Sequence, residues 1–179
     1  MRIISGNRRG KRIEAPDNLP VRPTTDFAKE SLFNILNNYF HLDAIQVLDL
    51  FAGTGNISYE FAARGALQVY AVDNNQNCVN FINETSKKLQ FNQIMALRSD
   101  AIGFLKSCRQ QFNVIFADPP YDWEAHAQLS MLVCENQLLL PDGFLVIEHP
   151  ASISFKEHPK FYQQRNYGRV NFSFFAENL

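Results

Sequence analysis

The chain has 179 residues, of which 46% are hydrophobic and 20% charged, and this composition is typical of one compact globular domain with an apolar core. No run approaches the roughly 20 apolar residues of a membrane span, and basic residues follow Met1, so we expect neither a membrane partner nor a signal peptide. The formal net charge of −1 does not by itself indicate a nucleic-acid-binding protein.

The cysteines are few and widely spaced. Cys78, Cys108 and Cys134 form no C-x-x-C pair, which argues against a zinc site and against a disulfide scaffold. This pattern fits a reducing compartment, so we expect a cytoplasmic protein without a metal.

The first 40 residues differ in character from the rest. Glycine and proline interrupt residues 1–25, for which we expect an extended conformation. Asp26 is the expected N-cap of a helix that runs to about Phe40, because apolar residues recur there at helical spacing. We treat residues 1–40 as a basic N-terminal extension and helix, and residues 41–179 as the core of the same compact domain.

The core alternates apolar strands with amphipathic helices. The expected strands are Val47–Phe51, Val69–Asp73, Ile94–Arg98, Phe112–Ala117 and Phe144–Glu148. The expected helices lie near Ile57–Arg64, Gln76–Leu89, Ala101–Cys108 and Glu124–Leu138. This alternation predicts a mostly parallel sheet with helices on both faces. Phe161–Tyr167 and Val170–Ala176 flank Gly168 and predict an antiparallel hairpin at one sheet edge.

Carboxylates follow consecutive strands of this sheet, and ligands of such sheets bind beyond the carboxyl ends of the strands. Asp49 and Phe51 end the first strand, and Gly53 and Gly55 form a turn that lets a ligand approach the backbone. Asp73 comes roughly twenty residues later, a spacing typical of an acid that binds ribose hydroxyls.

The charge of Asp49 would repel a pyrophosphate but attract an ammonium group. The third glycine of a dinucleotide fingerprint is also missing, because Ser58 stands there, so a nicotinamide oxidoreductase is disfavoured. S-adenosylmethionine, with its ribose, adenine and cationic amino acid, fits better.

Two further positions belong to the predicted cofactor site. Asn74 follows Asp73, and Asp100-Ala101 follows the third strand. Asp100 could accept a hydrogen bond from an adenine amine or act as a plain N-cap of the next helix, and the sequence favours neither reading.

The motif Asp118-Pro119-Pro120-Tyr121 follows the fourth strand. Its prolines restrict the backbone and lack N–H donors, Asp118 adds acceptors, and Tyr121 adds a flat face. Such a site suits a planar ligand whose amine donates to Asp118 and to a carbonyl near Pro119. The predicted catalytic residues are Asp118, Pro119 and Tyr121, and Asp118 is also counted with the cofactor site.

Together these segments resemble the bacterial 16S ribosomal RNA guanine-N2 methyltransferases of the small-subunit methyltransferase D type. The similarity extends over essentially the whole chain and rests on these segments: Arg2–Gly6, Gly10-Lys11, Arg22–Asp26, Leu32–Leu36, Asp49–Gly55, Asp118–Tyr121 and Glu148-His149. The chain departs from the family's usual residues at Ser58, Asp73, Phe27 and Lys29.

The resemblance implies a Rossmann-like class I fold with a seven-stranded sheet, and methyl transfer from S-adenosylmethionine to the exocyclic amine of one guanine. The partner would be 16S ribosomal RNA or an assembling small-subunit particle. The implied RNA contacts are basic or polar residues of the N-terminal extension: Arg2, Arg8, Arg9, Lys11, Arg12, Arg22 and Thr24. On charge alone, this segment could equally be a solvated terminus.

Other acceptors remain open from the motif alone. Adenine N6, cytosine N4 and a glutamine amide also present an NH₂ group beside a polar edge. A non-catalytic RNA-binding protein is a third reading, which the set of Asp49, Asp73 and Asp118 disfavours. We regard His149 as structural, since a lone histidine at a strand end has many such uses.

Overall fold

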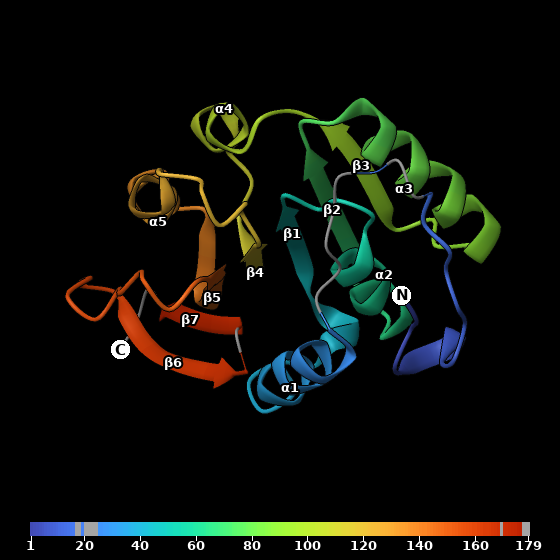
Figure 1. Cartoon of the computed structure of the whole chain (residues 1–179), viewed down its shortest axis with the longest axis horizontal. Coiled ribbons are helices and arrows are strands. Elements are labelled where there is room, and N and C mark those ends of the chain that lie inside the picture. The colour runs from blue at the N-terminus through green and yellow to red at the C-terminus, as the bar shows by residue number, and fades with distance from the viewer. Residues whose placement is uncertain (17–18, 20–24, 169, 177–179) are drawn as a thin grey trace.

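The computed structural model describes residues 1–16, 19, 25–168 and 170–176. A single mixed sheet dominates the fold, with the strand order β3-β2-β1-β4-β5-β7-β6 (Figure 1). The strands are β1 (Gln46–Leu50), β2 (Gln68–Asp73), β3 (Ile94–Arg98), β4 (Phe112–Ala117), β5 (Leu139–His149), β6 (Phe161–Tyr167) and β7 (Val170–Ala176).

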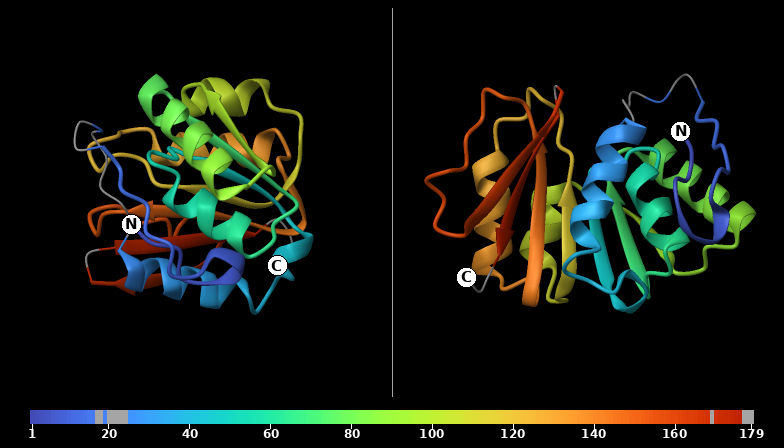
Figure 2. Two further views of the ribbon diagram at one scale, coloured as in Figure 1. Left: turned by 90° about the vertical axis from the view of Figure 1, so that its right-hand side faces the viewer. Right: turned by 90° about the horizontal axis from the view of Figure 1, so that it is seen from below.

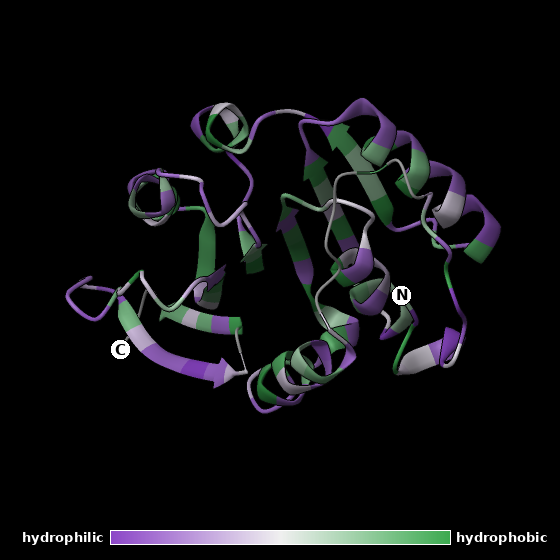
Figure 3. Ribbon diagram, viewed as in Figure 1, coloured by the Kyte–Doolittle hydropathy of each residue, from purple (hydrophilic) through white to green (hydrophobic). Residues whose placement is uncertain are grey.

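Strands β1 to β5 are parallel, and β7 pairs antiparallel with both β5 and β6. The expected seven-stranded, mostly parallel sheet with an antiparallel C-terminal hairpin is therefore confirmed. The outer strand β6 is largely polar (Figure 3), as suits an edge that faces water. The parallel strands end along one common edge, which brings the segments after β1, β2 and β4 together.

Helices cover both faces of the sheet (Figure 1). They are α1 (Asp26–Leu36), α2 (Asn56–Ala63), α3 (Gln76–Leu89), α4 (Ala101–Ser107) and α5 (His126–Glu135), with short 3-10 turns at Gly6–Arg8 and Leu42–Ala44. Leu32, Phe61 and Ile82 bring α1, α2 and α3 into one apolar cluster on the first face. Leu105 and Leu129 bring α4 and α5 into a second cluster on the other face.

The N-terminal segment is packed onto the core and is not simply extended. The Ile3 N–H donates to the Lys11 carbonyl at 3.0 Å, and the Ile13 N–H donates to the Met1 carbonyl at 3.0 Å, which closes a hairpin over residues 1–13. Ile3 and Ile13 are buried in the core cluster of α1 and α2. In Figure 2 this segment, drawn in blue, lies beside α2 and α3.

Several predicted boundaries shift. Thr25, not Asp26, is the N-cap of α1, because its hydroxyl accepts the Ala28 N–H at 3.2 Å. Helix α1 ends at Leu36 rather than near Phe40. Strand β1 ends at Leu50, since Phe51 has a positive φ of 60°.

Two elements near the C-terminal half also differ in length from expectation. Helix α5 is shorter than the predicted Glu124–Leu138 segment, and β5 begins at Leu139 rather than at Phe144. Leu139 pairs with Phe112, and a register irregularity then separates Phe112 from Val114 along β4. Among the described residues, no helix combines the length and apolarity needed to cross a bilayer.

Candidate active site

A cavity of about 610 Å³ opens at the carboxyl edge of the sheet, where β1, β2 and β4 end. Predicted site residues that line it are Asp49, Phe51, Gly53, Asp73, Asn74, Asp118, Pro119 and Tyr121. Residues that the sequence analysis did not assign to a site also line it: Ala52, Thr54, Asn56, Ile57, Asn75, Cys78, Phe116, Pro120, Trp123 and Glu148. The cavity combines carboxylates with aromatic rings.

The turn after β1 is held by the end of β2. One carboxylate oxygen of Asp73 accepts the Gly53 N–H at 2.8 Å, and the other accepts the Asn75 N–H at 2.8 Å. Gly53 and Gly55 both have positive φ, of 54° and 79°, which glycine adopts without strain. Asp73 therefore shapes the cavity wall, in addition to the ribose contact predicted for it.

Asp49 is 1% exposed and has an unusual electrostatic environment. It accepts a hydrogen bond from the hydroxyl of Ser58. Burial raises the pKa of Asp49 to about 7 against the lowering effect of the Ser58 hydrogen bonds, and the nearby charges of Asp118 and Asp73 add to the rise. A cation bound beside Asp49 would offset the cost of ionising this buried carboxylate.

The Asp118–Tyr121 motif forms another part of the cavity wall. Tyr121 is 50% exposed, so its ring lies at the mouth of the cavity. The Trp123 N–H donates to the Pro120 carbonyl at 2.9 Å, so that carbonyl already has a partner. The Trp123 ring packs edge-on against Phe51 at 5.0 Å between centroids, which joins the motif to the end of β1.

Asp118 and Glu148 lie at the ends of the adjacent strands β4 and β5 and point to the same face of the sheet. Side chains alternate along a strand, and Phe116 and Val146 belong to one core cluster, so the positions two residues later point the same way. Both carboxyl groups reach the cavity, and Glu148 is only 4% exposed. Burial and the charge of Glu148 raise the pKa of Asp118 well above its usual range.

His149 points to the other face of β5. Its Nε2 lies 2.8 Å from the Ser173 hydroxyl and its Nδ1 lies 3.0 Å from the Pro150 carbonyl oxygen. The ring is fully buried, and burial lowers its pKa. These contacts support the structural role that we expected.

Three of the predicted cofactor residues do not line the cavity: Gly55, Asp100 and Ala101. The Asp100 carboxylate accepts the Gly103 N–H at 2.7 Å and so caps α4. Between its two possible roles, the structure therefore places Asp100 as an N-cap, and its contact with an adenine stays a prediction.

The basic residues of the N-terminal hairpin differ in their surroundings. Arg8 donates to the Leu89 carbonyl at 3.1 Å and to the Gln90 side chain at 3.1 Å. Arg2 pairs with Asp26 at 2.6 Å. Exposed side chains in this hairpin include Arg9, Lys11 and Arg12. The predicted RNA contacts Arg22 and Thr24 lie outside the described residues.

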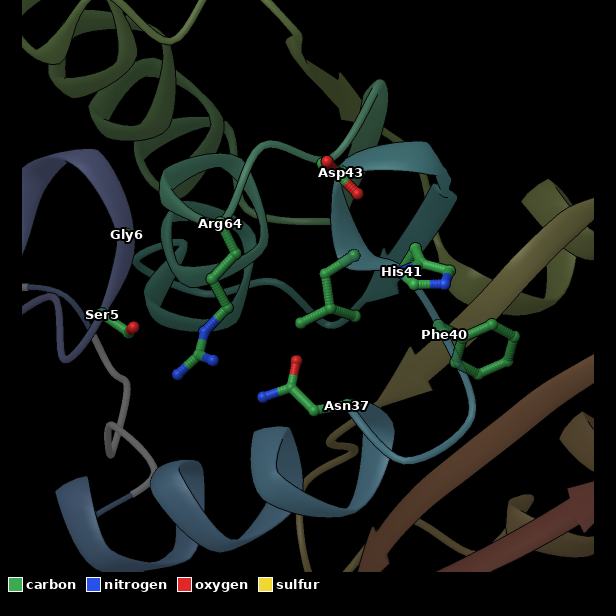
Figure 4. A pocket seen from close by; sticks show the side chains of 8 residues that line it. Ser5, Gly6, Asn37, Phe40, His41, Asp43 and Arg64 are labelled. Carbon is green, nitrogen blue, oxygen red and sulfur yellow. The ribbon is translucent and has the colours of Figure 1, made fainter.

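A second recess of about 470 Å³ lies near the start of β1 (Figure 4). Arg64 reaches it, but its guanidinium already bonds to Glu60 at 3.0 Å and sits 4.5 Å from the Phe33 ring centroid. None of the predicted catalytic residues lines this recess, so it is the weaker candidate site. The described part of the chain holds no group of three or more side chains suited to binding a metal ion.

Comparison with known proteins finds one matching family and relatives that are named as methyltransferases or methylases. Residues 1–176 match the family described as "Conserved hypothetical protein 95". A putative rRNA methyltransferase of Bacillus subtilis, YlbH, is 35% identical over 161 residues, which cover 88% of this chain and 86% of the relative. The ribosomal RNA small subunit methyltransferase D of Haemophilus influenzae is 32% identical, with 83% and 78% covered. The solved structure of putative methylase HI0767 from Haemophilus influenzae superposes with a TM-score of 0.78 at 28% identity, covering 97% of this chain and 96% of that one.

Proposed function

The chain belongs to the conserved hypothetical protein 95 family and is similar to a relative named small-subunit methyltransferase D, and we propose that it methylates the N2 amine of a guanine in 16S ribosomal RNA. The observation that carries this proposal is the shared cavity: Asp118-Pro119-Pro120-Tyr121 faces the same space as Asp49 and the glycine turn. A cationic cofactor and a planar amine can therefore meet there.

The donor set fits S-adenosylmethionine. Asp49 is a buried carboxylate on the cavity wall whose pKa is raised by burial, and a positive charge beside it would favour the ionised form. Asp73 keeps its carboxylate at the end of β2, where ribose hydroxyls are bound in folds of this kind. The cofactor supplies a methyl group on a cationic sulfur, which keeps the electron pair of the broken C–S bond.

Asp118 and the Pro119 carbonyl position the acceptor. The guanine N2 lone pair is delocalised into the ring, so the amine is a poor nucleophile. Hydrogen bonds from the amine to Asp118 and Pro119 hold it in line and favour the tetrahedral nitrogen that forms as the methyl arrives. Alignment of this kind supplies several kcal/mol, and the Tyr121 ring stacks on the base.

The new C–N bond leaves N2 positively charged, and N2 then releases one proton. Asp118 takes this proton, since its raised pKa makes it a better acceptor than an ordinary aspartate. The released methylguanine is neutral.

The N-terminal hairpin binds the RNA backbone. Exposed Arg9, Lys11 and Arg12 are suited to phosphate contacts, because each can release a counterion on binding. The buried Ile3 and Ile13 hold this hairpin against the core. Positive charge is therefore fixed to the domain that carries the cavity.

The test is product identification. The purified protein is incubated with S-adenosylmethionine labelled in the methyl group and with separate RNA, DNA and protein acceptors, and labelled RNA is digested to nucleosides for mass spectrometry. We expect N2-methylguanosine from small-subunit RNA. Label confined to DNA or protein, or recovered as N6-methyladenosine or N4-methylcytidine, would overturn the proposal.

A further inference from the structure

Glu148 is the carboxylate on the cavity wall for which the proposed chemistry gives no role. It comes from β5, directly beside the end of β4, and its side chain is 4% exposed. The pairs Phe116–Val146 and Ala117–Ile147 fix the register up to the cavity. Asp118 and Glu148 are therefore cross-strand neighbours on one sheet face, about 5 Å apart at the backbone.

Two adjacent carboxylates present acceptors and no donors when they are ionised. The complementary partner is an edge with two neighbouring N–H donors. Guanine has such an edge, since its ring N1–H lies next to its exocyclic N2 amine. Adenine and cytosine place a ring-nitrogen acceptor beside the amine, and a glutamine amide places a carbonyl there, so each would set a lone pair against a carboxylate.

We propose that Glu148 is the residue that selects guanine: its carboxylate accepts the hydrogen bond from N1–H while Asp118 and the Pro119 carbonyl hold the N2 amine. This inference rests on the proposed function and deepens it, because it assigns the choice between acceptors to one side chain. The aromatic wall of Phe116, Tyr121 and Trp123 bounds the space in which a planar base would lie.

The assignment also explains an otherwise costly arrangement. Carboxylates side by side on a buried sheet face repel one another, and the charge of Glu148 adds to the rise in the pKa of Asp118. A base edge with two donors gives each carboxylate a hydrogen bond at once. An edge with only one donor would leave the second carboxylate without its partner, which a site built for hydrogen bonding rejects strongly.

The experiment compares two RNAs that differ only at the nucleotide methylated by the wild-type protein. One carries guanine and the other 2-aminopurine, which keeps the C2 amine but has an acceptor at N1 and no N1–H. We expect the wild-type protein to favour guanine in kcat/KM by roughly 10–100-fold. In Glu148→Gln the amide N–H can donate to N1 of 2-aminopurine, so the preference should fall to near unity or reverse.

Matched controls separate selection from folding and from cofactor binding. Glu157→Gln removes an exposed carboxylate from the same part of the chain and should keep the full preference for guanine. Calorimetry should give Glu148→Gln the cofactor affinity of the wild type.

The possible failures are distinguishable. Equal turnover of both RNAs by the wild-type protein overturns the role of Glu148, whether or not the variant folds. An unchanged preference in folded Glu148→Gln does the same, and both results leave N2 methylation standing. Absence of N2-methylguanosine from every wild-type reaction overturns the proposed function and this inference together.

Discussion

The ammonium nitrogen of Lys29 lies 3.4 Å from Oε2 of Glu60, and both side chains are almost completely withdrawn from solvent. Glu60 also accepts the backbone N–H groups of Ile4 and Ser5, at 2.9 and 3.0 Å. Lys29 donates to Oδ1 of Asn56, a residue on the cavity wall, at 2.8 Å. One buried network therefore ties the N-terminal hairpin to α1 and to the start of α2.

Removing one member of this network should destabilise the fold. Burial lowers the pKa of Lys29 even though Glu60 opposes the shift, so the pair exists at a desolvation cost. Lys29→Ala leaves Glu60 buried with Arg64 as its remaining cation and should cost about 3–5 kcal/mol in the free energy of unfolding. Urea unfolding measures this, with exposed Lys106→Ala as the control. A change below about 1 kcal/mol would mean that the pair contributes little.

Cofactor affinity should depend on pH through Asp49. The pKa of Asp49 is about 7, so the free protein is partly protonated there, while a bound cation favours the carboxylate. Affinity for S-adenosylmethionine should therefore rise between about pH 6 and about pH 8, with proton release on binding. Calorimetry in buffers of different ionisation enthalpy detects the protons. Asp49→Asn should bind more weakly and with a flatter pH dependence, and an equally steep dependence in that variant would assign the titration elsewhere.

The same raised pKa affects the stability of the cofactor-free protein. Because the folded protein holds the Asp49 proton more tightly than the unfolded chain does, this group contributes stability that is fully present below about pH 4. That contribution is lost as the pH rises through about 7. Comparing urea midpoints of wild type and Asp49→Asn across this range isolates it, and parallel curves for the two proteins would contradict the assignment.

RNA binding should depend on the exposed cations of the hairpin. Replacing Arg9, Lys11 and Arg12 with glutamine should weaken binding and reduce the salt-dependence slope by roughly 2–3, since about one counterion is released for each phosphate contact. Arg8→Gln is the comparison, because Arg8 is bonded to the end of α3 and should change the slope less. Filter-binding titrations at several salt concentrations give the slopes. An unchanged slope in the triple variant would make the hairpin a solvated surface only.

Tyr121 should act through its ring. Stacking on a nucleic-acid base contributes about 1–3 kcal/mol, so Tyr121→Ala should slow transfer by about 10–100-fold. Tyr121→Phe keeps the ring and should remain close to the wild-type rate. Single-turnover rates at saturating cofactor compare the two variants. A large loss in Tyr121→Phe would show that the hydroxyl, rather than the ring, is needed.

Local patterns predicted most of the sheet, because strand alternation and apolar runs are properties of short segments. Helices α1 and α2 and the strands on either side of the glycine turn each contain such a local apolar pattern. Boundaries that depend on distant partners were missed. Asp26 looks like an N-cap, but its carboxylate pairs with Arg2 of the N-terminal hairpin, and Thr25 is the N-cap instead.

Some residues of the site could be predicted from local patterns, whereas others depend on distant partners and could not. Asp49, Asp73 and Asp118 each lie at or just beyond the carboxyl end of a recognisable strand, so their convergence could be inferred from topology. Glu148 lies inside an apolar strand, and only the register of β5 against β4 brings it beside Asp118. The available signal was its place two residues after Val146, on the face that Phe116 and Asp118 share. The buried partner of Lys29 is Glu60, 31 residues away, and no local pattern around Lys29 indicates that pairing.

The central claim is that Asp118 fixes the acceptor amine, and the most direct measurement is single-turnover methyl transfer to small-subunit RNA by Asp118→Ala at saturating cofactor. The rate should fall by about 10²–10³ while the fold stays as in the wild type, and saturating cofactor keeps any change in cofactor affinity out of the measured rate. Asp122→Ala removes an exposed carboxylate from the same loop and should transfer at the wild-type rate. Near-normal transfer by Asp118→Ala would contradict the account, because Asp118-Pro119-Pro120-Tyr121 would then be only a structural turn.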